Sequence, residues 1–220
     1  MPADFETVVG KKSSSLDEDW LRQRAEDYSG VALDIGTGDG RFVIAAAREE
    51  PDWLWIGLDP VKENMAKSAR TAQSSIKRGG VPNAIFIRGT AEMLPGPFAG
   101  LADRITINYP WGSLLKIVSI PQKTLLERIK GCGKQGARVD IYLNYSTFTD
   151  PEYLDRLGFS ESTDPATDPS LLETYVEAGF ARPERTLFSG DPPFKSQWGR
   201  QLVRGADRQS LHLSTRILAN

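Results

Sequence analysis

The stretch that decides the fold is Val31-Ala32-Leu33-Asp34-Ile35-Gly36-Thr37-Gly38-Asp39-Gly40. Its first half is an apolar run typical of a buried strand. The glycines that follow let the backbone turn tightly and approach a ligand closely. Residues 41–50, RFVIAAAREE, then suit a helix. Strand, glycine loop and helix in this order predict a ligand site at the carboxyl end of the first strand.

Further apolar runs alternate with helical segments on the carboxyl side of this stretch. Six of them read as strands, at residues 54–60, 84–89, 104–110, 137–145, 184–188 and 211–217. Helical patterns fall at residues 61–78, 123–130 and 171–180. This alternation predicts a doubly wound α/β fold, in which helices cover both faces of a mostly parallel, seven-stranded sheet.

The first 30 residues form an N-terminal extension to this pattern. A short strand is expected at residues 5–9 and a turn at residues 11–14. Ser15-Leu16-Asp17-Glu18 has the form of a capping box, so a helix should begin there.

We expect residues 1–220 to form a single domain. Two inserted loops, 146–170 and 189–210, should lie near its active site. The second is long for a connection inside a compact domain, and such loops are often functional.

The composition excludes several classes of protein. Hydrophobic residues make up 40% and charged residues 25%, the balance of a globular protein, and no apolar run approaches the ~20 residues of a membrane span. The N-terminus lacks the basic and apolar segments of a signal peptide. The single cysteine, Cys132, excludes an internal disulfide and leaves too few soft ligands for zinc. We therefore expect a cytoplasmic protein with no membrane partner and no metal.

Charge is unevenly distributed although the net charge is only −2. Residues 62–78 and 195–216 are basic, whereas residues 150–191 are acidic. These segments could form a polarised surface that binds nucleic acid, or they could be ordinary solvated faces.

The glycine loop is neither a dinucleotide fingerprint nor a P-loop. Arg41 stands where the fingerprint needs its third glycine, and no Gly-Lys-Ser/Thr follows. The pattern D-x-G-x-G-x-G instead resembles the first motif of class I methyltransferases, which would place Asp34, Gly36, Thr37 and Gly38 at S-adenosylmethionine. Asp59 ends the second strand, where a carboxylate can accept hydrogen bonds from both ribose hydroxyls or merely cap the next helix. Ala91 and Glu92 follow the third strand, at the expected place of the adenine ring.

The fourth strand ends in Asn108-Tyr109-Pro110-Trp111-Gly112-Ser113, which should line the same pocket. Trp111 could be a core residue, but its place beyond a strand end favours a functional role. The only histidine, His212, is expected to be structural. Cys132 lacks the setting of a catalytic nucleophile.

Several segments together resemble the Kam/Npm type of aminoglycoside-resistance methyltransferases, which modify N1 of adenine 1408 in 16S ribosomal RNA. They are DIGTGDGR, GLDPVKEN, KRGGVPNAIF, AEMLP, YPWGSLL and Ser196-Gln197-Trp198. The resemblance implies cofactor contacts at Gly36, Asp59, Ala91, Glu92, Asn108, Tyr109, Pro110, Trp111, Gly112, Ser113, Ser196, Gln197 and Trp198. It also implies that Trp111 and Trp198 hold a flipped adenine and that Arg208 contacts the RNA backbone. Within the basic stretches, Arg70, Lys77, Arg78, Arg200 and Arg204 are further candidates for RNA contact.

The implied chemistry explains why no catalytic acid or base stands out. Adenine N1 carries a lone pair and no proton at neutral pH, so its attack on a sulfonium methyl group needs no general base. The enzyme must flip the base, align it and exclude water. The expected substrate is the 30S ribosomal subunit, the products include S-adenosylhomocysteine, and the enzyme should be a monomer.

Three alternatives remain open at the level of sequence. Asn108-Tyr109-Pro110-Trp111 resembles the N-P-P-Y/F/W motif of enzymes that methylate exocyclic amino groups. A small-molecule methyltransferase could use residues 189–210 as its lid. A protein that binds S-adenosylmethionine and RNA but turns over slowly is the third.

Overall fold

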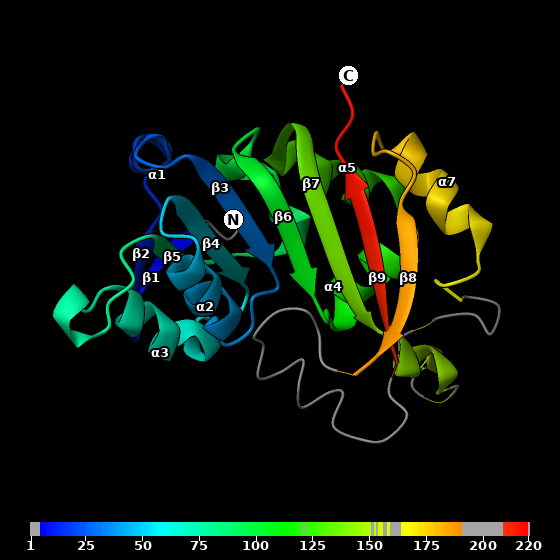
Figure 1. Ribbon diagram of the computed structural model, residues 1–220, viewed down its shortest axis with the longest axis horizontal. Coiled ribbons are helices and arrows are strands. Elements are labelled where there is room, and N and C mark those ends of the chain that lie inside the picture. Colours follow the sequence, from blue (N-terminus) through cyan, green and yellow to red (C-terminus); the bar gives the residue numbers. More distant parts are fainter. Residues whose placement is uncertain are drawn as a thin grey trace.

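A computed structural model describes residues 5–120, 122–150, 152, 154–155, 158, 164–190 and 209–219. Within these residues, nine strands form one sheet in the order β2-β1-β5-β4-β3-β6-β7-β9-β8 (Figure 1). Their bounds are β1 Glu6–Val9, β2 Lys12–Ser15, β3 Gly30–Ile35, β4 Trp53–Asp59, β5 Ala84–Arg88, β6 Ala102–Asn108, β7 Gly133–Asn144, β8 Glu184–Ser189 and β9 Gln209–Arg216.

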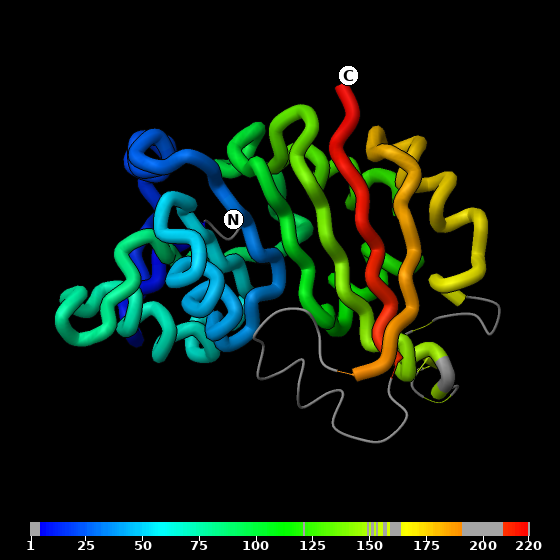
Figure 2. Tube along the Cα trace, in the orientation of Figure 1, coloured from blue at the N-terminus to red at the C-terminus, as the bar shows by residue number. Residues whose placement is uncertain are grey.

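The five central strands, from β5 to β7, are parallel to one another. The last strand of the chain, β9, inserts antiparallel between β7 and β8, which Figure 2 shows as the red strand beside the orange one. These seven strands are the ones that the sequence predicts, so the doubly wound class is correct.

The predicted seven-stranded sheet has too few strands, because the N-terminal extension adds two: β1, which is the short strand expected at residues 5–9, and β2, which was not expected. β1 pairs antiparallel with β5, and β2 pairs antiparallel with β1. The expected turn at residues 11–14 is mostly strand β2, whose sequence is Lys-Ser-Ser-Ser. An edge strand with one partner and a solvated surface needs no apolar alternation, so its pattern resembles that of a loop.

Helices cover both faces of the sheet, as expected. α2 (Arg41–Glu49) and α3 (Lys62–Ala72) pack on one face. α1 (Glu18–Glu26), α4 (Gly112–Ser119), α5 (Lys123–Cys132) and α7 (Pro169–Glu177) pack on the other. The central strands are therefore buried on both sides: Ala32 of β3 contacts the first group, and Leu33 and Ile35 contact the second.

Three helix predictions need correction. α1 begins after Asp17, whose carboxylate accepts the Trp20 N–H at 3.0 Å, because Ser15 is still paired in β2. α3 ends at Ala72 rather than Arg78 and is followed by the short 3₁₀ helix η1 (Ile76–Arg78). The sequence pattern missed α4 altogether. Five of its eight residues are buried and its only charged residue is Lys116, so it lacks a broad polar face that would reveal helical periodicity.

The fold brings the carboxyl ends of β3, β4, β5 and β6 to one edge of the sheet. The segments that follow these strands, including the 3₁₀ helix η2 (Ala91–Met93), meet there. The other 3₁₀ helices are η3 (Gly96–Phe98) and η4 (Tyr145–Thr149). Within the described residues, every helix falls short of the length and apolar character needed to cross a bilayer.

Candidate active site

A cavity of about 660 Å³ lies at this edge of the sheet, within the size range of small-molecule sites. Every predicted cofactor residue that the structure describes lines it, except Gly112. Those residues are Asp34, Gly36, Thr37, Gly38, Asp59, Ala91, Glu92, Asn108, Tyr109, Pro110, Trp111 and Ser113. The predicted contacts Ser196, Gln197 and Trp198 lie outside the described residues.

The glycine loop forms one wall of the cavity because its backbone adopts conformations that other residues avoid. Gly36 has φ of +76°, and a Cβ there would lie 2.6 Å from a methyl carbon of Leu114. Gly38 has φ of +58°, and a Cβ there would project into open space. The loop is held by the N–H groups of Gly36 and Thr37, which both donate to the Leu58 carbonyl. A side chain at Gly38 would occupy space that a ligand can use.

Asp59 stands opposite this loop at the end of β4. One carboxylate oxygen accepts the Gly38 N–H and the other accepts the Val61 N–H, each at 2.9 Å. Burial raises the pKa of Asp59, against the effect of these two N–H groups. Asp59 thus caps the start of α3, which was one of the two roles that the sequence allowed for it. Each oxygen keeps a second lone pair, so a ribose diol can be bound as well.

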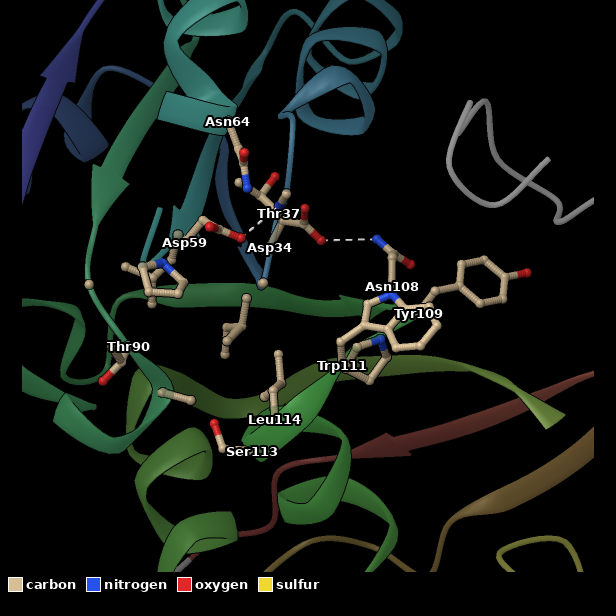
Figure 3. Close-up of a pocket in the computed structure, with 18 of the residues that line it drawn as sticks. Asp34, Thr37, Asp59, Asn64, Thr90, Asn108, Tyr109, Trp111, Ser113 and Leu114 are labelled. Atoms are coloured by element: carbon tan, nitrogen blue, oxygen red, sulfur yellow. Dashed lines mark hydrogen bonds between the residues drawn. The ribbon is translucent and has the colours of Figure 1, made fainter. Parts of the chain in front are cut away.

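Asp34 is a second buried acid, and its partners are side chains. One oxygen accepts the Thr106 hydroxyl at 2.7 Å. The same oxygen accepts the Asn108 Nδ2–H at 2.9 Å (Figure 3). Burial raises the pKa of Asp34 to about 6, although these hydrogen bonds oppose the shift. Because Nδ2 of Asn108 faces the carboxylate, its Oδ1 is turned away from Asp34, and this buried oxygen has no hydrogen-bond partner in the described part of the chain.

The opposite side of the cavity is formed by η2 and the start of α4. Glu92 is exposed at this rim. Burial opposes its ionisation, but its own backbone N–H and the hydroxyls of Ser113 and Thr90 hold its pKa below the usual value. Polar groups are therefore available on this side for an adenine ring.

Trp111 lies at the mouth of the cavity, directly before α4 (Figure 3). It is 42% exposed, whereas Trp55 in the core is 2% exposed. Tyr109, two residues before Trp111, has φ of +51°. Its N–H donates to the Tyr142 carbonyl at 2.7 Å, and its hydroxyl lies 3.1 Å from Ser210 Oγ. The exposure of Trp111 argues against a role in the core.

The predicted RNA residues Arg70, Lys77 and Arg78 are exposed on α3 and η1, outside the cavity. Arg48 of α2 joins them, since its guanidinium donates to the Gly79 carbonyl at 3.0 Å. We call Arg48, Arg70, Lys77 and Arg78 the α3 basic patch. The candidates Arg200, Arg204 and Arg208 lie outside the described residues.

The cavity also contains residues that sequence reasoning missed. They are Ile35, Asp39, Phe42, Leu58, Pro60, Asn64, Gly89, Thr90 and Leu114. Most of them are neighbours, along the chain, of a residue that was predicted to contact the cofactor, so their position next to the motifs could have indicated that they line the cavity. Phe42 and Asn64 lie in the first turns of α2 and α3, and only the packing of these helices turns them toward the ligand space.

The two remaining chemically distinctive residues are structural. His212 Nε2 lies 2.9 Å from Asp140, and its ring stacks on Tyr142. Cys132 ends α5, and burial raises the pKa of its thiol to about 12, which is the opposite of what a nucleophile needs. Among the described residues, no group of three or more His, Cys, Asp or Glu side chains could hold a metal ion.

The fold and the cavity define a class I S-adenosylmethionine-dependent methyltransferase. Comparison with known proteins identifies the family. Residues 6–217 match the NpmA family, described as 16S rRNA (adenine(1408)-N(1))-methyltransferase. An Escherichia coli enzyme of that name is 34% identical, with 96% of this chain and 97% of the relative covered. This chain therefore belongs to the 16S rRNA (adenine(1408)-N(1))-methyltransferase family.

Solved structures agree with this assignment. The aminoglycoside resistance methyltransferase NpmB1 has a TM-score of 0.85 at 32% identity, with 97% of this chain and all of that chain covered. A variant of the 16S rRNA (adenine(1408)-N(1))-methyltransferase from Catenulisporales acidiphilia, solved with the cosubstrate SAM, has a TM-score of 0.82 at 25% identity. That comparison covers 98% of this chain and 97% of the other.

Proposed function

We propose that this enzyme methylates N1 of adenine 1408 of 16S rRNA within the 30S subunit, and that this modification confers aminoglycoside resistance. Trp111 carries the proposal, because its exposed indole at the mouth of the cavity offers a stacking surface for a base. Family membership supports the choice of base and nitrogen. The whole of residues 1–220 would act as one domain and as a monomer, in the cytoplasm where 30S subunits are assembled.

The cavity fits S-adenosylmethionine part by part. Gly36 and Gly38 leave room for the methionine portion, Asp59 has free lone pairs for the ribose, and Ala91 and Glu92 border the space left for the adenine. When bound, this cofactor supplies a methyl group on a positively charged sulfur. The part that falls to the chain is to hold the target base in line and to keep water out.

The target adenine would stack on Trp111 with N1 facing the cavity, and Trp198 would cover its other face. The N1 lone pair forms the new bond to carbon while the carbon–sulfur bond breaks, so no proton has to move. The adenine becomes cationic, and the negative face of an indole favours that charge by ~1–2 kcal/mol in a desolvated site.

Mapping of the modified nucleotide tests this proposal. Purified 30S subunits are incubated with the enzyme and labelled cofactor, and the labelled nucleoside is identified by digestion and by primer extension. We expect 1-methyladenosine at position 1408 and growth in the presence of aminoglycosides when the gene is expressed. Label in N6-methyladenosine, at another position, or only in a small molecule would contradict the proposal.

A further inference from the structure

The starting observation is the amide of Asn108 at the end of β6. Its Nδ2 donates to Asp34 at 2.9 Å, which fixes the amide so that Oδ1 faces away from the acid (Figure 3). That oxygen is buried without a hydrogen-bond partner in the described residues. A buried acceptor without a partner costs free energy and is rare in native proteins. It is therefore a place where a bound molecule should present a donor.

The position of Asn108 selects the donor. Its side chain lines the cavity beside Trp111, the residue proposed to stack on the target base. An adenine whose N1 faces the cofactor presents its exocyclic amino group next to N1, on the same edge of the ring. That amino group is a donor, whereas guanine has a carbonyl oxygen at the same place. An acceptor here thus discriminates between the two purines.

We propose that Asn108 Oδ1 accepts a hydrogen bond from the exocyclic amino group of the target adenine, and that Asp34 positions and polarises Asn108 for this role. The inference rests on the proposed function. It makes Asn108 a catalytic residue that touches substrate and Asp34 a positioning residue that acts through it.

The hydrogen bond should strengthen during the reaction. As N1 binds the methyl carbon, positive charge spreads over the ring and onto the amino group, which becomes a better donor. The chain of contacts from Asp34 through the amide to the amino group places a buried negative charge behind this positive one. Such an interaction favours the transition state over the bound substrate, so its loss lowers kcat more than it raises KM.

The test combines a change in the protein with a change of one functional group on the base. Subunits are reconstituted with 16S rRNA that carries either adenine or purine at position 1408, since purine lacks the amino group but keeps N1. Asn108→Leu removes the acceptor at nearly constant volume. We expect kcat to fall about tenfold to a hundredfold on the adenine substrate and less than about threefold on the purine substrate. Equal losses on both substrates would overturn the proposal.

Two further measurements exclude a structural explanation. Thr106→Val removes the Thr106 hydroxyl, which donates to Asp34, but leaves Asn108 in place, so any loss it causes should be equal on adenine and purine. Calorimetry should give Asn108→Leu an affinity for S-adenosylmethionine within about threefold of the wild type. A fall in that affinity equal to the fall in kcat would assign Oδ1 to the cofactor and refute the role proposed for it. Failure of the wild-type enzyme to methylate adenine 1408 would instead refute the proposed function.

Discussion

At the scale of single residues, the cavity contains two buried acids whose partners differ. Asp59 accepts backbone N–H groups from the glycine loop and the start of α3, whereas Asp34 accepts side-chain donors from β6. The first arrangement holds the acid rigidly where a ribose can reach it. The second connects the acid to a side chain that can contact a substrate. The two acids should therefore respond differently to substitution.

Asp59→Ala should abolish most cofactor binding. The hydrogen bonds to the ribose are lost, at a cost of about 3 kcal/mol or a hundredfold in affinity. Asp103→Ala is a matched control, because Asp103 also accepts a backbone N–H, from Val31, but does not line the cavity. Calorimetry with S-adenosylmethionine should show normal affinity for the control. Near-normal affinity of the Asp59 variant would remove the ribose assignment.

The raised pKa of Asp34 predicts a pH dependence. Burial raises its pKa to about 6 in the folded protein, above the ordinary value of 3.8; the hydrogen bonds from Thr106 and Asn108 oppose this shift, and the nearby charge of Asp59 adds to it. Asp34 therefore contributes most to the free energy of unfolding below about pH 4, and this contribution is lost as the pH rises through 6.

For catalysis the sign is reversed, because the charge behind Asn108 exists only above the pKa. The rate at saturating substrate should fall about tenfold between about pH 7.5 and about pH 5. Asp34→Asn should be slower at neutral pH and should lose this step. A step of the same size in the variant would assign the pH dependence to another group or to the ribosome.

The exposed indole of Trp111 predicts a loss of activity without a loss of stability. A stacked ring contributes ~1–3 kcal/mol, so Trp111→Phe should keep part of the methylation rate and Trp111→Ala should remove most of it. Trp20→Ala is the control, because Trp20 on α1 is 39% exposed and lies outside the cavity. Thermal melting of all three variants should resemble the wild type. A large drop in Tm for Trp111→Ala would instead indicate a packing role.

At the scale of elements, the sequence predicts whatever depends on local periodicity. β3 and β4, which carry Asp34 and Asp59 near their carboxyl ends, are almost wholly apolar, and β6, which ends in Asn108, has isoleucines at alternate positions. Each is therefore recognisable as a strand, and chain order then places their carboxyl ends together. β2 and α4 were missed because one is an edge strand and the other a buried helix, and neither shows the alternation expected of its type. The direction of the Asn108 amide could not be predicted, since it depends on a contact 74 residues away along the chain.

The start of α1 allows a direct test of one correction. Asp17 caps the helix by accepting the Trp20 N–H, while Ser15 belongs to β2. Asp17→Ala should lower the free energy of unfolding by about 1 kcal/mol. Ser15→Ala should change it by less than about 0.5 kcal/mol, as expected of an exposed edge position. Denaturant unfolding of both variants measures the difference, and a larger effect at Ser15 would restore the capping box.

At the scale of the whole molecule, the fold separates residues that the charge pattern had grouped. Arg216, at the end of the second basic stretch, lies opposite Arg138 of β7, and its guanidinium donates to the Gly136 carbonyl. Both contacts are near the start of β7, at the edge of the sheet opposite the cavity. The α3 basic patch, by contrast, lies along a helix whose first turns reach the cavity at Asn64. Of these two locations, the α3 basic patch is the one that suits an RNA whose base enters the cavity.

Binding of the 30S subunit should therefore depend on salt through the α3 basic patch. Each phosphate contact releases counterions, so the logarithm of the affinity should fall linearly with the logarithm of salt concentration. Lys77→Glu and Arg78→Glu together should weaken binding and reduce that slope by about 1 to 2, because one or two phosphate contacts are lost. These exposed side chains are on η1, at the far end of α3 from the cavity, so the cofactor site should not be affected. Arg216→Glu reverses one charge on the opposite edge, against two in the double variant, and should leave the slope unaltered. Filtration binding at several salt concentrations compares the three proteins, with affinity for S-adenosylmethionine expected to be the same in all of them. An equal slope in the wild type and the double variant would move the RNA-binding surface away from α3.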